Sequence, residues 1–187
     1  HCLPGYRICC RGGMNVKKNS KRILSIMLAF IMILTAFPMT AMAEEAWDGM
    51  AIDTDWYDGN ENEFTIDSAE DLAGLAELVN GGNNFSGKTI KLGADIDLGG
   101  NEWTPIGTNG KPFRGTFDGN NMTISNLYIN KEFANNAANC CVGLFGYTSA
   151  PAVIKNTNFV NVDIQGSLYV GTVVGYGFTG SKISNCH

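Results

Sequence analysis

The segment Val142-Gly-Leu-Phe-Gly-Tyr147 returns as Val170-Gly-Thr-Val-Val-Gly-Tyr176, with the two tyrosines 29 positions apart. A second marker has nearly the same period, since an Ile-x-Asn triplet ends at Asn126, Asn156 and Asn185, at offsets of 30 and 29 residues. Two markers with one period indicate structural repeats that stack on each other. The C-terminal part of the chain therefore predicts a fold built from repeats.

Each repeat unit has the composition of short strands, because β-branched and aromatic residues alternate with Gly and Asn. Such a strand cannot bury its apolar side alone, so neighbouring units must stack to make a core. Short strands separated by tight corners fit one coil of an all-β solenoid, a parallel β-helix. Asn and Gly accept the left-handed backbone that corners require. We therefore expect Asn126, Asn156 and Asn185 at equivalent corners, either as a stacked amide ladder or simply as turn formers.

The amino-terminal region has the pattern of an export signal. Basic residues between Met14 and Arg22 precede an apolar stretch over residues 23–37, which leads to Ala41-Met-Ala43. This order is typical of a secretory signal peptide. We assign residues 14–43 to a signal peptide cleaved after Ala43, with an uncleaved anchor as the alternative. Residues 1–13 fit no signal-peptide start, and we interpret them as translated upstream sequence.

Charge and cysteine usage narrow the function classes of the mature chain. After residue 43, seven Lys and Arg stand against eighteen Asp and Glu, a difference of −11. Nucleic-acid recognition needs a basic surface, so the composition predicts no nucleic-acid partner. Membrane contact is expected only through the signal peptide during export. Cys140, Cys141 and Cys186 are odd in number and two are adjacent, so we favour free thiols over a disulfide framework.

Two regions precede the repeats. Residues 44–63 are rich in Asp, Glu, Gly and Asn, and we interpret them as an acidic linker. Residues 64–112 are expected to hold a capping helix and the first solenoid strands. Ser68 and Asp71 have capping-box spacing, and apolar residues follow at helical intervals up to Val79. A helix at this place can cover the first open coil, whose unpaired edge would otherwise favour aggregation.

Two shorter segments also carry a prediction. Residues 89–98 alternate between apolar and polar positions, as one half-buried strand does. Residues 130–139 are rich in Asn and Ala and are expected to loop out between coils.

Several of these motifs together resemble secreted bacterial proteins with GLUG-motif repeats. The resemblance covers residues 64–187 and departs from the usual pattern at Thr157 and Thr172. It implies a right-handed parallel β-helix on a large secreted or cell-surface protein, with no catalytic residue in the repeat. It also implies that residues 113–187 are repeats of about 30 residues, truncated at the C-terminus of an N-terminal fragment. The motifs are Asp71-Leu72, Leu75-Ala76, Asp95-Ile-Asp97-Leu98, Trp103-Thr-Pro-Ile-Gly107, Phe113-Arg-Gly-Thr-Phe-Asp-Gly119, Ile124-Ser-Asn-Leu127, Gly143-Leu-Phe-Gly146 and Val170-Gly-Thr-Val-Val-Gly175.

Three carboxylates are the strongest candidates for chemistry. Asp95, Asp97 and Asp118 could supply an acid and a base for glycoside cleavage, and Arg114 could hold a sugar carboxylate. Asp95 and Asp97 could instead bind Ca²⁺. We prefer a third interpretation, in which these side chains keep an exposed strand face soluble. No catalytic residue and no cofactor is predicted.

Aromatic residues suggest a binding role. Trp103 and Tyr128 are candidates for stacking on a ligand, together with Arg114 and Asp118, whereas Tyr147 and Tyr176 are expected to pack on each other. The sequence thus predicts a secreted or cell-surface scaffold or adhesin-like module without catalysis, whose partner is a host glycan or surface protein. The alternative is part of a secreted enzyme, either a carbohydrate-active β-helix or the N-terminal stalk of a surface peptidase.

Overall fold

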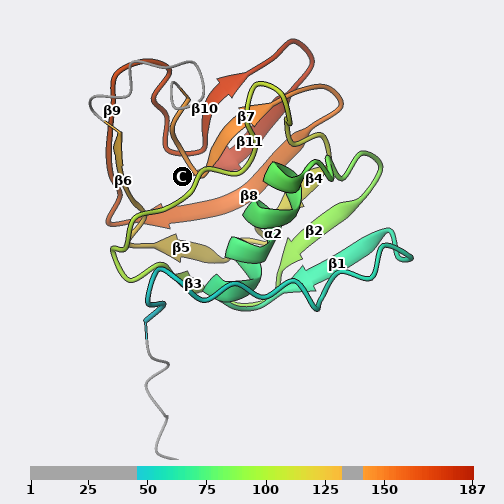
Figure 1. The fold of residues 1–187 in the computed structure, drawn as a ribbon, viewed down its shortest axis with the longest axis horizontal. Coiled ribbons are helices and arrows are strands. Elements are labelled where there is room, and N and C mark those ends of the chain that lie inside the picture. Colours follow the sequence, from blue (N-terminus) through green and yellow to red (C-terminus); the bar gives the residue numbers. More distant parts are fainter. Residues whose placement is uncertain (1–45, 132–140) are drawn as a thin grey trace, which may run out of the picture. The chain divides into compact units, whose positions relative to one another are not determined.

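The computed structural model describes residues 46–131 and 141–187, which form mainly strands and one helix (Figure 1). The predicted signal peptide, its cleavage site at Ala43, and Cys140 lie outside the described residues. The expected strand-rich composition with one helix is confirmed. In chain order the elements are β1 (Glu63–Ile66), α2 (Ala69–Gly81), β2 (Thr89–Leu92), β3 (Ile96–Asp97), β4 (Thr116–Asp118), β5 (Thr123–Ser125), β6 (Tyr128–Lys131), β7 (Phe145–Thr148), β8 (Val153–Val160), β9 (Asp163–Gly166), β10 (Val174–Gly177) and β11 (Lys182–Cys186).

The named strands pair only in parallel. The longest ladder contains β1, β2, β4, the first half of β8 and β11, and it aligns Ile90, Phe117, Ile154 and Ile183 in one column. Parallel neighbours need a long crossover between them, so strands that are far apart in sequence become adjacent in space. The apolar side chains of this column are buried, except for the last member, Ile183, which is about half exposed.

Further ladders complete each passage of the chain. β3, β5 and the second half of β8 form one ladder, β6 pairs with β9, and β7 pairs with β10. One passage through these ladders is called a layer below. The second layer is residues 89–113, the third is residues 116–131 and 141–148, and the fourth is residues 153–177. β1 with α2 makes the first layer, and β11 begins the fifth.

The register corrects the expected equivalence of the three asparagines. β8 turns between two ladders at Asn156, which has φ 55°, and Asn185 lies in the same column of corners, with φ 51°. Asn126, with φ 57°, lies instead at the next corner, because Ile124 pairs with Phe159 and not with Ile154. The prediction is therefore right for Asn156 and Asn185 and wrong for Asn126. A left-handed backbone at all three positions confirms their role as corner residues.

The helix α2 forms as its sequence predicts. The Ser68 hydroxyl accepts a hydrogen bond from the Asp71 N–H at 3.1 Å, and the Asp71 carboxylate accepts one from the Ser68 N–H at 3.3 Å. This capping box satisfies donors that the first helical turn leaves unpaired. Gly82, with φ 119°, ends the helix in the left-handed conformation that glycine tolerates best. The apolar stripe from Leu72 to Val79 is buried against the neighbouring layer.

Residues 46–62 are not the free linker that their acidity suggested. Trp47 is 5% exposed, and its ring meets Trp103 edge-on with centroids 5.8 Å apart. The Asp53 N–H donates to the Glu70 carbonyl at 3.0 Å, which attaches the segment to α2. Burial of one large apolar side chain is worth about 1.5–3 kcal/mol, so the aromatic residues outweigh the acidic ones in placing this segment.

The alternating segment 89–98 also differs from its prediction. Ile90, Leu92, Ile96 and Leu98 are buried as expected, but the strand is interrupted at residues 93–95. A Cβ at Gly93 would collide with the Asp67 carboxylate and the Thr65 methyl group, so a larger residue at this corner would have to displace these side chains. The chain turns here from the first ladder to the second, and alternation alone cannot show such a turn. Likewise β6 extends to Lys131, into the segment expected to loop out.

Aromatic rings connect successive layers inside the core. Phe85, Phe113 and Phe145 follow each other with centroid separations of 6.4 and 5.0 Å, and all three are almost fully buried. Tilted aromatic pairs at this spacing stabilise by about 0.5–1.5 kcal/mol beyond the area they bury. The core is therefore continuous from the second layer to the third.

Candidate functional site

The three candidate carboxylates lie at corners of the layers, and each accepts hydrogen bonds from the next layer. Asp95 accepts from the Thr123 N–H at 2.7 Å. Asp97 accepts from the Asn126 amide at 2.7 Å, and Asp118 accepts from the Asn156 amide at 2.9 Å. The carboxylate oxygens of Asp97 and Asp118 therefore serve as hydrogen-bond acceptors between layers.

The first of two side-chain columns contains Asp97, Asn126 and Asn161. The Asn126 amide donates to Asp97, and the Asn161 amide donates to the Asn126 oxygen at 3.3 Å. The Asn126 side chain and the Gly99 N–H both donate to Asp97, which lowers the pKa of this carboxyl below its ordinary value. A hydrogen bond to the charged form favours that form. Asp97 is thus held ionised by the corner it stabilises.

The second column contains Asp118, Asn156 and Asn185. The Asn156 amide donates to Asp118, and one layer further along the chain the Asn185 amide donates to the Asn156 oxygen at 3.1 Å. Lys155 also pairs with Asp118 at 3.0 Å. Partial burial acts to raise the pKa of Asp118, but the donors Asn156 and Lys155 outweigh it and leave the pKa lowered.

Both columns have the same polarity. Each asparagine amide donates toward the N-terminal layers, and each column begins with an aspartate, which can only accept when ionised. We call these columns the Asp–Asn ladders. The Ile-x-Asn marker predicted a ladder of asparagines, but it joined two different corners and therefore did not identify Asn161 or the two aspartates.

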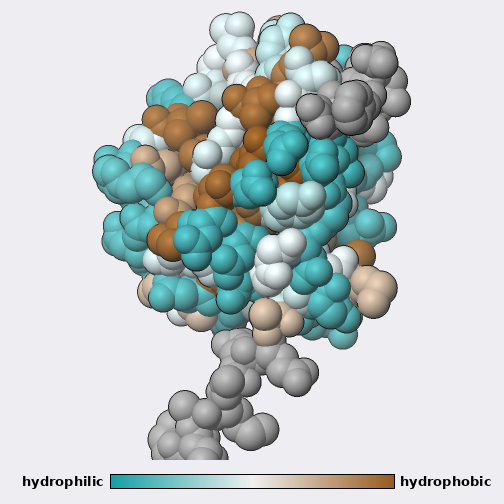
Figure 2. Space-filling model, turned by 90° about the vertical axis from the view of Figure 1, so that its left-hand side faces the viewer, coloured by the Kyte–Doolittle hydropathy of each residue, from teal (hydrophilic) through white to brown (hydrophobic). Residues whose placement is uncertain are grey.

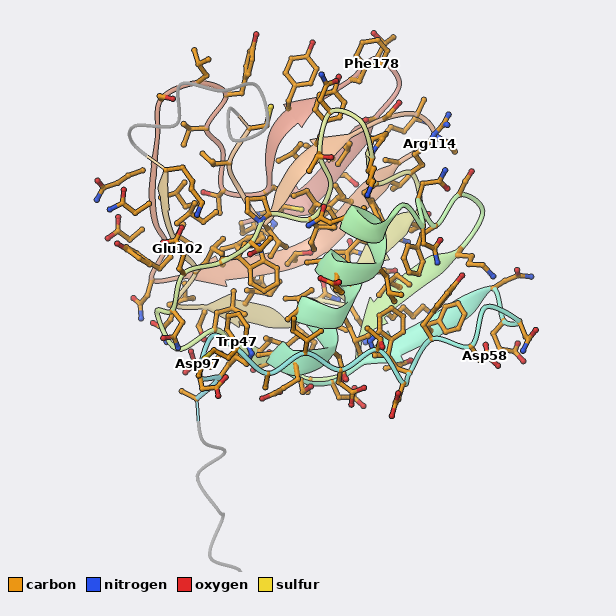
Figure 3. All side chains as sticks on the ribbon, in the orientation of Figure 1. Trp47, Asp58, Asp97, Glu102, Arg114 and Phe178 are labelled. Atoms are coloured by element: carbon orange, nitrogen blue, oxygen red, sulfur yellow. The ribbon has the colours of Figure 1, made fainter. Side chains whose placement is uncertain are left out.

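This geometry bears on the proposed chemistry of the carboxylates. Among residues 46–131 and 141–187, no three His, Cys, Asp or Glu side chains come together in a way that would hold a metal ion. Arg114, the candidate partner for a sugar carboxylate, donates its Nε–H to the Ala150 carbonyl at 2.8 Å. Figure 3 shows Arg114 and Asp97 on opposite sides of the molecule, so these two residues do not form one site.

The aromatic candidates fall into two groups. Trp103 is 1% exposed, and its indole N–H donates to the Leu144 carbonyl at 3.1 Å, so it is a core residue rather than a ligand platform. Tyr128 lies half-buried on β6. The expected packing of Tyr147 on Tyr176 is confirmed, with stacked rings whose centroids are 4.9 Å apart.

The tyrosine pair continues to the surface. Tyr169 meets Tyr176 edge-on with centroids 4.9 Å apart, and it is 54% exposed. Phe178, which follows β10, is also about half exposed and projects outward in Figure 3. We call Tyr147, Tyr169 and Tyr176 the tyrosine cluster. Within this cluster, Tyr169 has the most exposed ring.

Cys186, one of the two cysteines that the structure describes, is a free thiol. Cys141 and Cys186 are both half-buried. Cys186 lines a hollow of about 350 Å³ together with Phe159, Val162 and Val173. The preference for free thiols is confirmed for Cys186.

Comparison with known proteins gives two partial similarities. The chain is 33% identical over 131 residues to Halomucin of Haloquadratum walsbyi, which covers 64% of this chain and 1% of that protein. It is 29% identical over 119 residues to a Gly-rich membrane protein of Evansella cellulosilytica, which covers 62% of this chain and 13% of the relative. No family model and no solved structure matches. This chain thus spans only a small part of either relative.

These similarities bear on location. The names of the two relatives point to a cell-surface or extracellular setting for the matched region. Across the described ranges, the structure contains no helix with the length and apolar character needed to cross a membrane.

Proposed function

We propose that this chain is a secreted or cell-surface module, coiled as a right-handed parallel β-helix, that acts as a scaffold or adhesin-like binding segment without catalysis of its own. The parallel ladders support the coil, because each passage of the chain adds one layer in register with the last. The GLUG-type resemblance of residues 64–187 supports the same fold. The names of the two relatives support the location.

The observation that carries the binding role is the tyrosine cluster. Two stacked rings fix the position of Tyr176, and Tyr176 supports Tyr169, whose ring is more than half exposed. Aromatic side chains held in place offer a large apolar face with a polar hydroxyl at little entropic cost. A host glycan, or a surface protein that carries one, fits this chemistry.

The same geometry supports the absence of catalysis as part of this proposal. Asp97 and Asp118 stay ionised and bound to asparagine amides, whereas a general acid needs a raised pKa. The enzyme alternative requires that one of these carboxylates loses its hydrogen bond to the asparagine amide. The stalk alternative places catalysis elsewhere in a longer polypeptide, where this module would present the catalytic domain.

A glycan array tests the proposal. The chain should bind a subset of immobilised glycans, and Tyr169→Ala should weaken that binding about tenfold, or about 1.4 kcal/mol. Met50→Ala is the matched control, because Met50 is an exposed apolar residue on another part of the surface. Equal binding by the Tyr169 variant and the parent would reject the tyrosine cluster as the site.

The same glycans serve to test the enzyme alternative. Incubation with the chain should release no reducing ends, and Asp118→Asn should behave as the parent does. Turnover by the parent that Asp118→Asn abolishes would establish the carbohydrate-active alternative instead.

A further inference from the structure

Two of the basic residues, Arg114 and Lys182, differ from the others in what surrounds them. Of the seven Lys and Arg that follow residue 43, five direct their ammonium group to an oxygen of the chain, namely Lys88, Lys91, Lys111, Lys131 and Lys155. Lys182 is exposed, and within the described residues its ammonium has no partner. Arg114 uses its Nε–H, which donates to the Ala150 carbonyl at 2.8 Å, whereas its terminal nitrogens have no partner within the same residues. These two cations are therefore available to a ligand.

Arg114 and Lys182 border the same short segment, residues 150–152. The Arg114 Nε–H reaches the Ala150 carbonyl from one side, and the backbone N–H of Lys182 donates to the Ala152 carbonyl at 2.9 Å from the other. Neighbouring strands lie about 4.8 Å apart, so the two backbones are roughly 10 Å apart across this segment. Both side chains are long enough to reach a group that lies over the segment between them.

Both side chains point away from the core. Arg114 lies between the buried residues Phe113 and Gly115, and Lys182 precedes Ile183, which continues the column of buried residues of the longest ladder. Successive side chains of an extended chain point to opposite sides, so Arg114 and Lys182 lie on the outward side. Outward positions face solvent rather than the neighbouring layers, and stacking of layers leaves them accessible.

The surface between the two cations is apolar. Pro151 is exposed and Ala150 is half-buried, and neither side chain carries a polar group. Phe178, which is 49% exposed, lies four residues before Lys182. Figure 3 shows Phe178 and Arg114 on the same side of the molecule. A ligand over Pro151 would thus meet two positive groups and apolar surface together.

This surface adjoins the tyrosine cluster. Thr148, which follows Tyr147 in β7, accepts a hydrogen bond from the Phe178 N–H at 2.9 Å and forms a bridge with Phe113, the residue before Arg114. Aromatic rings offer an apolar face on which a sugar ring stacks. Carboxylate and sulfate groups form strong charge-assisted hydrogen bonds with Arg and Lys. A glycan that carries an acidic group combines both kinds of contact.

We propose that Arg114 and Lys182 select acidic glycans, by binding a carboxylate or sulfate group over Pro151 while the sugar stacks on the neighbouring aromatic side chains. The inference deepens the glycan binding proposed above and rests on it. A nucleic acid fits this surface less well, because two cations neutralise only two phosphates and a net charge of −11 repels a long polyanion. A glycan with one or two acidic groups needs no wider basic surface.

Matched pairs of glycans test the proposal. Sialyllactose adds one acidic sugar to lactose, and its methyl ester keeps that sugar without the charge. The chain should bind sialyllactose about tenfold more tightly than either neutral glycan, because only the charged form pairs with Arg114 and Lys182. Sulfated lactose, compared with lactose, distinguishes a sulfate from a carboxylate ligand.

Two variants locate the preference. Lys182→Gln removes a charge without a partner in the described structure, so the fold should be kept and the preference for the acidic glycan should fall at least about threefold. Arg114→Gln should lower it further. Lys131→Gln changes the net charge equally and should leave the preference as it is. Lys131 lies on β6, on the side of the molecule that Figure 2 shows, whereas Arg114 lies on the other side in Figure 3.

The outcomes separate this proposal from the tyrosine cluster. Binding of all these glycans without an acidic preference overturns the proposal and leaves the proposed function intact, whereas no binding of any glycan rejects both. A preference that Lys131→Gln lowers as much as Lys182→Gln also overturns it, because net charge would then be the cause. A single-stranded oligonucleotide that binds as tightly as the best acidic glycan would assign the surface to nucleic acid instead. Tyr169→Ala should weaken acidic and neutral glycans alike and keep the preference.

Discussion

The first and the last strand of the longest ladder, β1 and β11, each have one strand neighbour, yet they differ in how far their side chains are covered. Phe64 and Ile66 of β1 are 6% and 0% exposed, whereas Ile183 of β11 is 49% exposed. The difference comes from the non-strand segments that cover β1. Residues 46–62 and α2 pack around β1, as Tyr57 does on Phe64 with ring centroids 4.9 Å apart.

This contrast shows how a stack of parallel strands is ended. Each layer buries one side on the layer before it and needs a second element for the other side. A helix with one apolar face supplies that element at the N-terminal end without offering a new strand edge. The C-terminal end has no such cover in the described structure, and its exposed apolar residues follow from that.

The largest expected effect compares two isoleucines of one column. Ile90→Ala should lower the free energy of unfolding by about 2–5 kcal/mol, because it leaves a cavity in a closed core. Ile183→Ala should cost less than about 1.5 kcal/mol, since half of this side chain already meets water. Urea unfolding of both variants measures the difference. Equal costs at the two positions would show that the C-terminal end is covered in solution.

A smaller effect is expected from the cap of α2. Ser68→Ala removes the hydroxyl that accepts the Asp71 N–H, and it should cost about 1 kcal/mol. Ser86→Ala is the control, because Ser86 is exposed and its hydroxyl makes no hydrogen bond within the described residues. The thermal midpoints of the two variants give the comparison. A Ser68 variant as stable as the Ser86 variant would mean that the cap contributes nothing to closing this end.

The smallest effect is a dependence of stability on pH. The pKa values of Asp97 and Asp118 are lowered in the folded chain, so the folded state binds fewer protons than the unfolded state near pH 4. Their stabilisation is therefore present above pH 4 and is lost as the pH falls through the lowered folded values. Asp97→Asn should reduce the loss of unfolding free energy at low pH by less than about 1 kcal/mol, because the carboxylate lies near solvent.

Urea titrations between pH 7 and pH 2 measure how the free energy of unfolding falls with pH. Asp163→Asn serves as the control, because the Asp163 carboxylate has no hydrogen-bond partner within the described residues. If Asp97→Asn leaves the pH dependence of the unfolding free energy unchanged, the ladder does not depend on an ionised Asp97 carboxylate.

Local patterns account for what the sequence predicted well. The capping box of Ser68 and Asp71 and the apolar stripe of α2 both depend on residues a few positions apart. Their hydrogen bonds and burial follow from backbone periodicity alone. The packing of Tyr147 on Tyr176 was predictable for a similar reason, since the two lie one short layer apart without a long insertion between them.

The candidate site was predicted less well. Asp97 and Asp118 were identified as notable, but their role depends on Asn126 and Asn156, which lie 29 and 38 residues away. Trp103 was proposed as a ligand platform, yet it is buried because Trp47, from the supposed linker, covers it. Such contacts depend on which layers become neighbours, and residue identity alone does not show which layers pair.

The sequence by itself determined that this chain is rich in short strands, has one capped helix before its repeats, and repeats with a period near 29 residues. Those properties reside in local backbone preferences and in the spacing of apolar side chains. Only the tertiary structure decided which corners stack, because the register between layers depends on the whole path of the chain. That path is 29 residues from Asn156 to Asn185 but 35 from Asn126 to Asn161. A period read from sequence cannot distinguish a longer path from a different corner, whereas paired strands can.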